Sequence, residues 1–396
     1  MPEYELADEY FNRSCRTVAG TPREQMPVLY GVFCRKPGVM AGVKDVGDFL
    51  AGKCPGPLTV RALSDGERFE ANQIVMTLEG PFGQLVTMET TCLGLLSLSA
   101  AAANMAAIVE AAGDVPVIDM AARHYPPELV EAIALAAAIG GAAGTSTPSG
   151  HSVVHERFGI GDERIQVGRQ APRPFGLYGT IPHSLNAVFG GSSIESAAAY
   201  RERCPDVPLI VLLDFEGRER EVCAEAARRF SYELAGVRLD TPANRIHQGG
   251  HEKVPPALEM RVLSQARDRA AAMAALARYG AGPGVTIEAV YAIRDLLDSH
   301  SAKSAKIVVS SGFDLDKVRA FRACNAPMDS IGTGSWVEFS TFTSDILKVC
   351  EDGQWIDRCK VGRREELIDL PDLPVILQKE GPTDEHESTR TDRVME

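Results

Sequence analysis

The sequence predicts an α/β protein: an incomplete, TIM-like β/α barrel of about seven strands with a discontinuous N-terminal α/β domain. From about residue 115, short apolar segments alternate with segments of helical length, as in parallel βαβ units. Residues 25–90 and the segment after residue 335 carry shorter β-like runs separated by turns, so they form a different unit. Seven parallel strands favour a barrel over the alternative, a doubly wound open sheet.

The elements follow in order along the chain. Residues 1–114 form the N-terminal domain and end in a helix at roughly 89–112. Residues 115–335 form the barrel, residues 336–380 return to the N-terminal domain, and the charged residues 381–396 form a mobile tail. The predicted barrel strands are 115–119, 140–145, 176–181, 208–214, 236–240, 306–311 and 328–332. The predicted barrel helices are 127–139, 192–204, 219–234, 257–300 (broken at 280–284) and 314–324.

Composition excludes several classes of protein. The net charge is −13 and the pI about 5.2, which argues against a nucleic-acid-binding surface. The most apolar stretch, 93–112, contains Asn104 and Glu110 and suits a buried helix better than a membrane span. The first ten residues are acidic, without the apolar run of a signal peptide. The nine cysteines are scattered, without a CxxC pair, so we expect reduced thiols in a cytoplasmic protein.

Small and polar residues follow nearly every predicted barrel strand. In a β/α barrel the carboxyl ends of the strands meet at one mouth, where active sites are built. We therefore predict an active site from these residues: Asp119 and Arg123; Gly144, Thr145 and Ser146; Gly179, Thr180, His183 and Ser184; Asp214; Arg238, Asp240 and Thr241; Ser310, Ser311 and Gly312; Gly332, Thr333, Gly334 and Ser335.

The last two strand ends suit a phosphate group. Ser311 and Gly312 precede a helix that opens at Asp314, and a helix N-terminus offers unpaired N–H groups and partial positive charge. The second turn contains Gly332, Gly334 and Ser335. The alternative is two tight turns with Asp314 as an ordinary helix cap.

Two further segments suit substrate binding or catalysis. Arg238 and Asp240 occupy alternate positions of one strand, so they point to the same side. With Arg245 they suit a sugar phosphate, arginine binding phosphate oxygens and Asp240 the ribose hydroxyls or Mg²⁺; the alternative is a structural ion pair. His183 can act as a general acid/base or a nucleophile, or only as a hydrogen-bonding residue of the loops.

Two histidine pairs have the four-residue spacing of metal ligands on a helix: His151 with His155, and His247 with His251. The second pair flanks two glycines, where a helix is disfavoured, and neither pair has an evident third ligand. We therefore expect no protein-bound metal site. Cys92 is expected to pack in the core and not to act in catalysis.

Taken together, the motifs EGPFGQLVTMET, DMAARHYPPE, IGGAAGTST, GTIPHS, GVRLDTPANR, IVVSSGFD and DSIGTGS resemble the nicotinate phosphoribosyltransferases, closest to their short archaeal-type branch. The resemblance implies a fold shared with quinolinate phosphoribosyltransferase. It implies synthesis of nicotinate mononucleotide from nicotinate and phosphoribosyl pyrophosphate (PRPP), with Mg²⁺ accompanying PRPP and ATP as co-substrate. It also implies a homodimer, or a higher assembly of dimers, in which one subunit closes the site of the other.

The resemblance also implies roles for individual residues. His183 would be phosphorylated to couple ATP hydrolysis to synthesis, with Thr180 and Ser184 beside it as substrate-binding residues. Arg123 would bind the nicotinate carboxylate, and Tyr10 and Phe11 would stack on the pyridine ring from the neighbouring subunit. Gly312 and Gly334 with Ser311 and Ser335 would hold the nucleotide phosphate, and Arg238, Asp240 and Thr241 the ribose and pyrophosphate.

Some features depart from the family. The chain has Ala122-Arg123-His124 where the family has two adjacent arginines, its 257–300 segment is longer, and it has no C-terminal cysteine-rich zinc site. Quinolinate and nicotinamide therefore remain alternative substrates. A lyase or isomerase on a phosphate-binding barrel, and a non-catalytic phosphate-binding homologue, are the alternatives from other classes.

Overall fold

The computed structural model describes residues 4–369 and 372–380, which fold into two compact units. The N-terminal unit contains the chain up to Ala103, residues Val167–Gln170 and the chain from Glu338 onward. The barrel unit contains Asn104–Gln166 and Ala171–Val337. The mobile tail expected at 381–396 lies outside the described residues.

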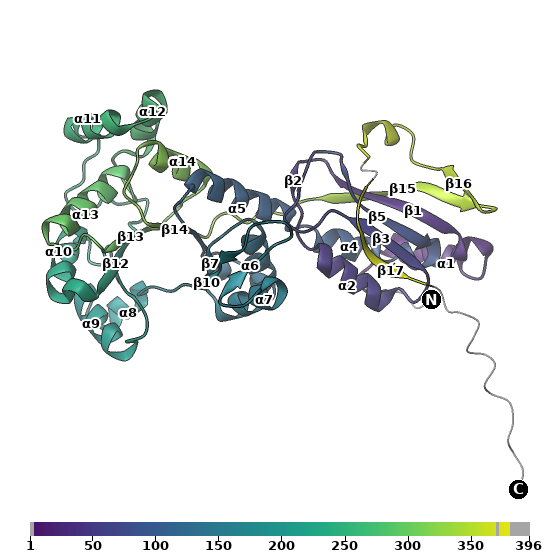
Figure 1. Cartoon of the computed structure of the whole chain (residues 1–396), viewed down its shortest axis with the longest axis horizontal. Helices are drawn as coiled ribbons and strands as arrows, with labels where there is room; N and C mark the ends of the chain where they lie inside the picture. Colours follow the sequence, from purple (N-terminus) through teal and green to yellow (C-terminus); the bar gives the residue numbers. More distant parts are fainter. Residues whose placement is uncertain (1–3, 370–371, 381–396) are drawn as a thin grey trace, which may run out of the picture. The chain divides into compact units, whose positions relative to one another are not determined.

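The N-terminal unit is built on a six-stranded antiparallel sheet in the order β16-β15-β1-β5-β3-β17 (Figure 1). Strands from beyond residue 335 lie within it: β15 (Phe342–Glu351) pairs with β1 (Pro27–Cys34), and β17 (Val375–Lys379) pairs with β3 (Leu58–Ala62). The unit is thus discontinuous in sequence. Its other elements are α1 (Glu9–Val18), β2 (Gly38–Val39), α2 (Val43–Lys53), β4 (Arg68–Phe69), β5 (Ile74–Pro81), α3 (Phe82–Leu85), α4 (Glu89–Leu95) and β16 (Gln354–Asp357).

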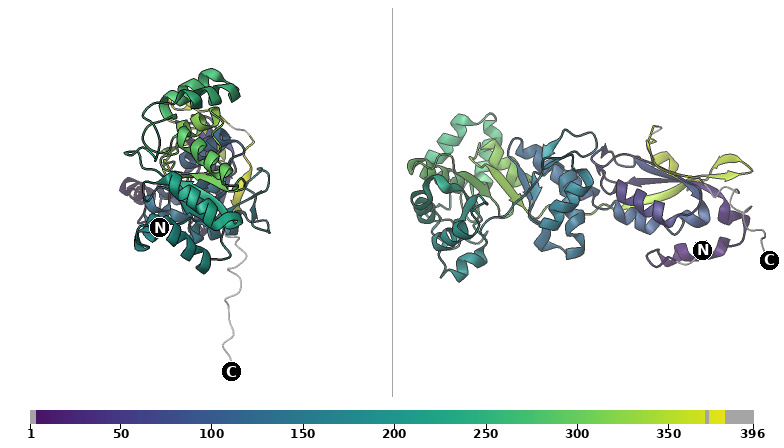
Figure 2. Two further views of the ribbon diagram at one scale, coloured as in Figure 1. Left: turned by 90° about the vertical axis from the view of Figure 1, so that its left-hand side faces the viewer. Right: turned by 60° about the horizontal axis from the view of Figure 1, so that its bottom comes forward.

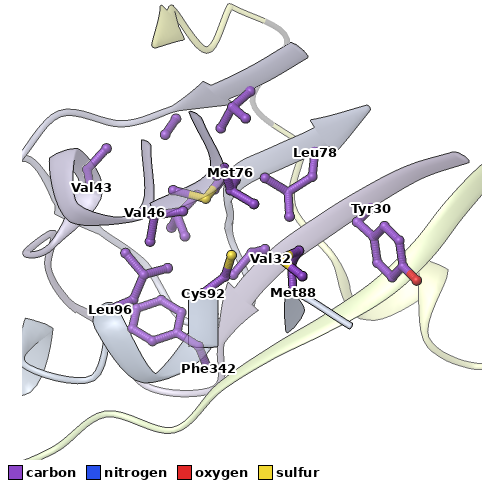
Figure 3. Close-up of a cluster of buried hydrophobic side chains, with 14 of the residues drawn as sticks. Tyr30, Val32, Val43, Val46, Met76, Leu78, Met88, Cys92, Leu96 and Phe342 are labelled. Carbon is purple, nitrogen blue, oxygen red and sulfur yellow. The ribbon is translucent and has the colours of Figure 1, made fainter. Parts of the chain in front are cut away.

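One face of this sheet carries the core of the unit, because apolar residues alternate along its strands. In β3, Leu58, Val60 and Ala62 are buried while the residues between them are more exposed. Helices α2 and α4 supply the opposing side chains, among them Val46 and Cys92 (Figure 3). Cys92 is 1 % exposed and burial raises the pKa of its thiol. It packs in the core, as the sequence predicted.

The apolar stretch Glu89–Ala112 is long and apolar enough to cross a membrane by length and composition, with a mean hydropathy of 1.9. The structure divides it into α4 and α5 (Ser99–Ala112), with a turn between them. Leu96 is fully buried in the core of the N-terminal unit, and Met105 and Ile108 of α5 are also buried. Of the most apolar window of the stretch, 39 % is buried within the structure.

The barrel unit contains a seven-stranded parallel sheet in the order β10-β7-β6-β14-β13-β12-β11. The first strand of the barrel, β6, pairs with the last, β14, so the sheet curls back on itself. It stays open between β10 and β11, the third and fourth strands along the chain. The predicted incomplete barrel is thereby confirmed. Its strands are β6 (Val117–Asp119), β7 (Gly144–Thr145), β10 (Gly176–Leu177), β11 (Leu209–Leu212), β12 (Leu234–Leu239), β13 (Lys306–Val309) and β14 (Ser330–Thr333).

Helices lie outside these strands (Figures 1 and 2). The segment predicted as one broken helix forms three, because Asp268 caps a new helix by accepting hydrogen bonds from the backbone N–H groups of Ala270 and Ala271. A helix absent from our prediction, α7, begins after Thr147, whose side chain accepts a bond from Gly150 N. The helices are α6 (Val130–Ile139), α7 (Pro148–Phe158), α8 (His183–Val188), α9 (Ser193–Arg203), α10 (Glu219–Phe230), α11 (Pro256–Gln265), α12 (Arg269–Tyr279), α13 (Ile287–Ser299) and α14 (Leu315–Ala323).

Candidate active site

A cavity of about 790 Å³ lies in the barrel unit, beside the carboxyl ends of strands β6, β7, β10 and β12. Seven residues predicted for the site line it: Arg123, Ser146, Gly179, Thr180, His183, Ser184 and Arg238. The Thr180 hydroxyl is buried and has no hydrogen-bond partner within the described residues, so it is free to bind a ligand. The structure thus gathers polar residues from separate strand ends.

A smaller cavity of about 190 Å³ lies at the ends of β12, β13 and β14. Its walls include both predicted phosphate turns. Arg123, Arg238 and Met120 line both cavities, so the two share a wall that carries two guanidinium groups. A ligand with a ring at one end and a phosphate at the other matches this pair of adjoining spaces. The turn residues in the smaller cavity are Ser310, Ser311, Gly312, Gly332, Gly334 and Ser335.

His183 is held by two carboxylates. Its Nε2 lies 3.1 Å from Asp214 Oδ2 and 4.0 Å from Asp240 Oδ2. The Asp214 side chain is 3 % exposed and the His183 side chain 41 % exposed, so the ring faces the cavity with its anchor behind it. Burial raises the pKa of Asp214, and the bond from His183 opposes that rise. Asp214 follows β11 and appeared among the strand ends, but the sequence did not indicate that it would orient His183.

Arg238 and Asp240 lie on the same side of their strand, as the alternation predicted. Arg238 Nη2 donates to Asp240 Oδ2 at 3.3 Å, and Ser310 Oγ donates to Asp240 Oδ1 at 2.8 Å. Arg238 Nε is buried and has no partner within the described residues. The pair therefore has the geometry of the structural alternative, an ion pair inside the barrel. It also retains an unused donor at the wall of both cavities.

The two phosphate turns differ in what their glycines do. Gly312 adopts φ +70°, and a Cβ built there meets no atom within 4 Å, so open space lies in front of it. A Cβ on Gly334 would lie 2.7 Å from the His124 ring and 2.9 Å from Met120 O, and one on Gly332 would clash with the Met120 side chain. Gly332 and Gly334 therefore let the segment that carries Arg123 approach strand β14. His124 Nδ1 and Gly334 O, 3.0 Å apart, join the same two segments.

The segment that bears Arg123 is anchored by Asp119, which is 1 % exposed. Its carboxylate accepts hydrogen bonds from Ala121 N, Thr145 Oγ1 and Trp336 Nε1 at 2.8–3.1 Å. Every one of these donors belongs to the fold, so Asp119 organises the mouth of the barrel without facing a ligand. Asp119, which we predicted as an active-site residue, thus supports the structure of the site.

Lys317 is a residue that the sequence analysis missed. It lies in the first turn of α14, is 9 % exposed, and donates from Nζ to Ser311 O at 3.0 Å. Lysine is common near the start of exposed helices, so its position in the sequence did not indicate a role in the site. Only the packing of α14 against the barrel turns it toward the phosphate turn.

Three groups of predicted residues lie elsewhere. Arg245 bonds the fully buried Glu219 carboxylate and Asp214 O, and it lines neither cavity. Thr241, also fully buried, donates to Glu219 Oε1 at 3.1 Å. Tyr10 and Phe11 lie on α1 of the N-terminal unit, their ring centroids 4.2 Å apart. Tyr10 is 60 % exposed.

One histidine of each pair bonds to the fold. His155 lies on α7, and its Nε2 is 2.9 Å from Phe175 O; His251 Nδ1 bonds Glu288. His247 is 3 % exposed, burial lowers its pKa, and its two ring nitrogens have no hydrogen-bond partner among the described residues. Within the described residues, no three His, Cys, Asp or Glu side chains are grouped so as to hold a metal ion.

Comparisons with known proteins bear on the fold. Residues 8–99 match the family model of the quinolinate phosphoribosyl transferase N-terminal domain, and a search of curated proteins finds no match. The structure resembles nicotinate-nucleotide pyrophosphorylase from Pyrococcus furiosus with a TM-score of 0.69 and 24 % identity, over 90 % of this chain and 77 % of that one. Human nicotinic acid phosphoribosyltransferase gives 0.58 and 16 %, over 87 % and 75 %.

A third structure, nicotinate-nucleotide pyrophosphorylase from Francisella tularensis, gives a TM-score of 0.52 and 12 % identity over 85 % of this chain and 95 % of that one. These solved structures share the architecture of both units with the chain. The chain therefore has the type II phosphoribosyltransferase fold, and its residues 8–99 match the quinolinate phosphoribosyltransferase N-terminal domain.

Proposed function

We propose that the chain is a nicotinate phosphoribosyltransferase of NAD biosynthesis, which forms nicotinate mononucleotide and pyrophosphate from nicotinate and PRPP. The single observation that carries the proposal is the placement of His183. It stands in the larger cavity, within 3.1 Å of buried Asp214 and 4.0 Å of Asp240. The fold and the family-model match support the phosphoribosyltransferase class.

The two adjoining cavities suit the two ends of the product. The 5′-phosphate would lie in the smaller cavity against Ser311, Gly312, Gly334 and Ser335, where backbone N–H groups can face an anion. The ribose would lie beside Asp240 and Arg238, which stand between that turn and His183. The nicotinate ring would then occupy the larger cavity.

Nicotinate would be oriented by its carboxylate. Arg123 lines the larger cavity and presents a guanidinium, whose planar fork matches a carboxylate. Tyr10 and Phe11 would stack on the ring from a partner subunit in a homodimer, which makes the proposed site complete only in the assembly. The single arginine, where the family has two, is the reason that nicotinamide must be tested as a competing base.

The reaction needs positioning more than acid/base chemistry. Pyrophosphate leaves C1′ of PRPP through a transition state of oxocarbenium character, and the pyridine nitrogen of nicotinate attacks that carbon without prior deprotonation. Arg238, with its unused Nε donor, would stabilise the charge on the leaving pyrophosphate. Mg²⁺ would enter as the PRPP complex, since phosphates and one or two carboxylates are its usual ligands.

ATP would act through His183. Its Nε2 faces Asp214, so the other ring nitrogen is the one left to attack the γ-phosphorus of ATP. The bond to a carboxylate fixes the tautomer and raises the basicity of the ring, as it does in catalytic Asp–His pairs. The phosphoryl group would then be transferred to water when the product is formed.

Quinolinate is the second candidate substrate, and the family-model match over residues 8–99 favours it. A second carboxylate would need a further cation in the larger cavity. Arg123 and Arg238 are the cationic side chains that line this cavity, and Arg238 is already bonded to Asp240. The charge balance of the cavity therefore favours a monocarboxylate.

The test is a product assay with PRPP and Mg²⁺, in which nicotinate, nicotinamide and quinolinate are offered separately, with and without ATP. Nicotinate mononucleotide formed from nicotinate, and stimulated by ATP, is the expected result. Release of CO₂ from quinolinate in preference would replace the proposal with its alternative. Absence of product from all three bases would leave only a phosphate-binding homologue.

A further inference from the structure

We propose that Lys317 is a positioning residue of the phosphate turn, whose ammonium holds the Ser311 carbonyl and places a positive charge directly behind the backbone that receives phosphate. The inference rests on the proposed function, because the ligand is taken to be PRPP. Lys317 lines neither cavity, so it would act through Ser311 and Gly312.

The turn itself needs such support. Ser311 and Gly312 both adopt left-handed backbone conformations, with φ of +72° and +70°. That conformation is free for glycine but unfavourable for serine. The Lys317 ammonium donates to Ser311 O at 3.0 Å, and Asp314 N donates to Gly312 O at 3.1 Å. The turn is therefore tied at two successive carbonyls to the start of α14.

The Lys317 ammonium is buried, and the nearest carboxylates, Asp314 and Asp240, act on it only from beyond ion-pairing distance. No carboxylate of the described residues lies within ion-pairing distance of Nζ, which instead lies 4.5 Å from the centroid of the Phe313 ring and 5.8 Å from that of Phe321. The hydrogen bond to Ser311 O uses one of the three N–H donors of the ammonium. A buried cation with this little compensation is stabilised when an anion binds nearby.

The protonation state of Lys317 follows from the same surroundings. Burial lowers the pKa of Lys317 to about 8, while the charges of Asp314 and Asp240 oppose the shift. The charge behind the turn is thus present at pH 7 and is lost as the pH rises through about 8. A phosphate group whose last pKa is about 6 is already mostly ionised at pH 7 and gains negative charge as the pH rises, so its own titration would not weaken binding. A weakening of PRPP binding between pH 7 and 9 would therefore indicate the loss of the Lys317 charge.

The experiment measures the dissociation constant of MgPRPP by calorimetry at pH 7, 8 and 9, for the full chain and three variants. Lys317→Met keeps the length of the side chain without its charge, and Lys317→Arg keeps a charge that does not titrate. Lys306→Met is the matched control, because Lys306 is a 66 % exposed lysine paired with Asp329 at the opposite end of β13.

The wild type and Lys306→Met are expected to bind MgPRPP about tenfold more weakly at pH 9 than at pH 7. At pH 7, Lys317→Met should bind MgPRPP at least about tenfold more weakly than the wild type. Its dissociation constant should change little between pH 7 and pH 9. Lys317→Arg should lose the alkaline weakening, which keeps the test decisive if Lys317→Met fails to fold. If Lys317→Arg shows the same pH dependence as the wild type, the inference about Lys317 is overturned while the proposed function still stands. Failure of the wild type to bind MgPRPP overturns the proposed function as well.

Discussion

Replacing His183 with alanine should separate two activities that most active-site changes remove together. The proposed site binds PRPP and nicotinate through other residues, so His183→Ala should still form nicotinate mononucleotide slowly without ATP. It should lose nicotinate-dependent ATP hydrolysis and any acid-labile phosphoryl group on the protein. The reason is that the attacking imidazole is gone while Arg123, Arg238 and the phosphate turns remain.

The structure sets the size of the accompanying effects. His183 gives Asp214 its side-chain hydrogen bond at 3.1 Å, and the other carboxylate oxygen is already buried without a partner in the described residues. Loss of the ring should therefore cost about 1–3 kcal/mol of unfolding free energy. A general acid/base role would instead lower ATP-independent turnover by roughly two to four powers of ten.

Product and ADP are measured separately by chromatography, and unfolding free energy by urea titration, for the wild type and two variants. His300→Ala is the control, because His300 lies at the end of α13 and bonds Leu296 O. Both activities should persist in it. ATP hydrolysis that stays coupled to product in His183→Ala would refute the phosphorylation reasoning, and a large loss of ATP-independent turnover would reassign His183 to acid/base catalysis.

Three further predictions follow from the same site. Nicotinate should be preferred over nicotinamide by more than tenfold in kcat/KM, about 1.4 kcal/mol. Arg123→Ala should erode that preference more than it weakens PRPP binding; equal use of both bases by the wild type would contradict this. Gly312→Val should abolish product formation while the fold persists. A Cβ at this position meets no atom, and only the φ of +70° adds strain, of about 1–2 kcal/mol. Wild-type turnover in this variant would show that the turn does not bind phosphate. Glu219→Ala should lower unfolding free energy by about 3–5 kcal/mol in urea titration, because it leaves Arg245 without its buried partner; a loss below 1 kcal/mol would refute that role.

Much of the barrel could be read from the sequence because its signals are local. Runs such as IVV and LIVL are mostly buried within a parallel sheet, so they are apolar and stand out from the helices between them. The small and polar residues that directly follow these strands mark the barrel mouth, and they too are a local feature of the sequence. Two barrel helices were missed: α8, which is only six residues long, and α7, which has a polar composition and begins with a Thr-Pro cap rather than an apolar stripe.

The side-chain contacts of the site could not be read in this way, because they join residues far apart in the chain. Asp214 meets His183 across 31 positions, and Arg245 turns to Glu219 although its place after β12 suited a phosphate. A guanidinium beside a buried carboxylate pairs with it, and no local pattern reveals that such a carboxylate is near. Lys317 likewise becomes part of the site only when α14 packs on the barrel.

The sequence by itself determined the barrel strands, the repeating strand–helix order, and the set of residues delivered to the barrel mouth. Tertiary structure alone decided where the barrel stays open, between β10 and β11, and which of the delivered residues face a cavity. It also decided which residues instead hold the mouth together, as Asp119 does. The physical reason is that apolar periodicity is a property of neighbouring residues, whereas pairing, burial and orientation depend on groups that only the folded chain brings together.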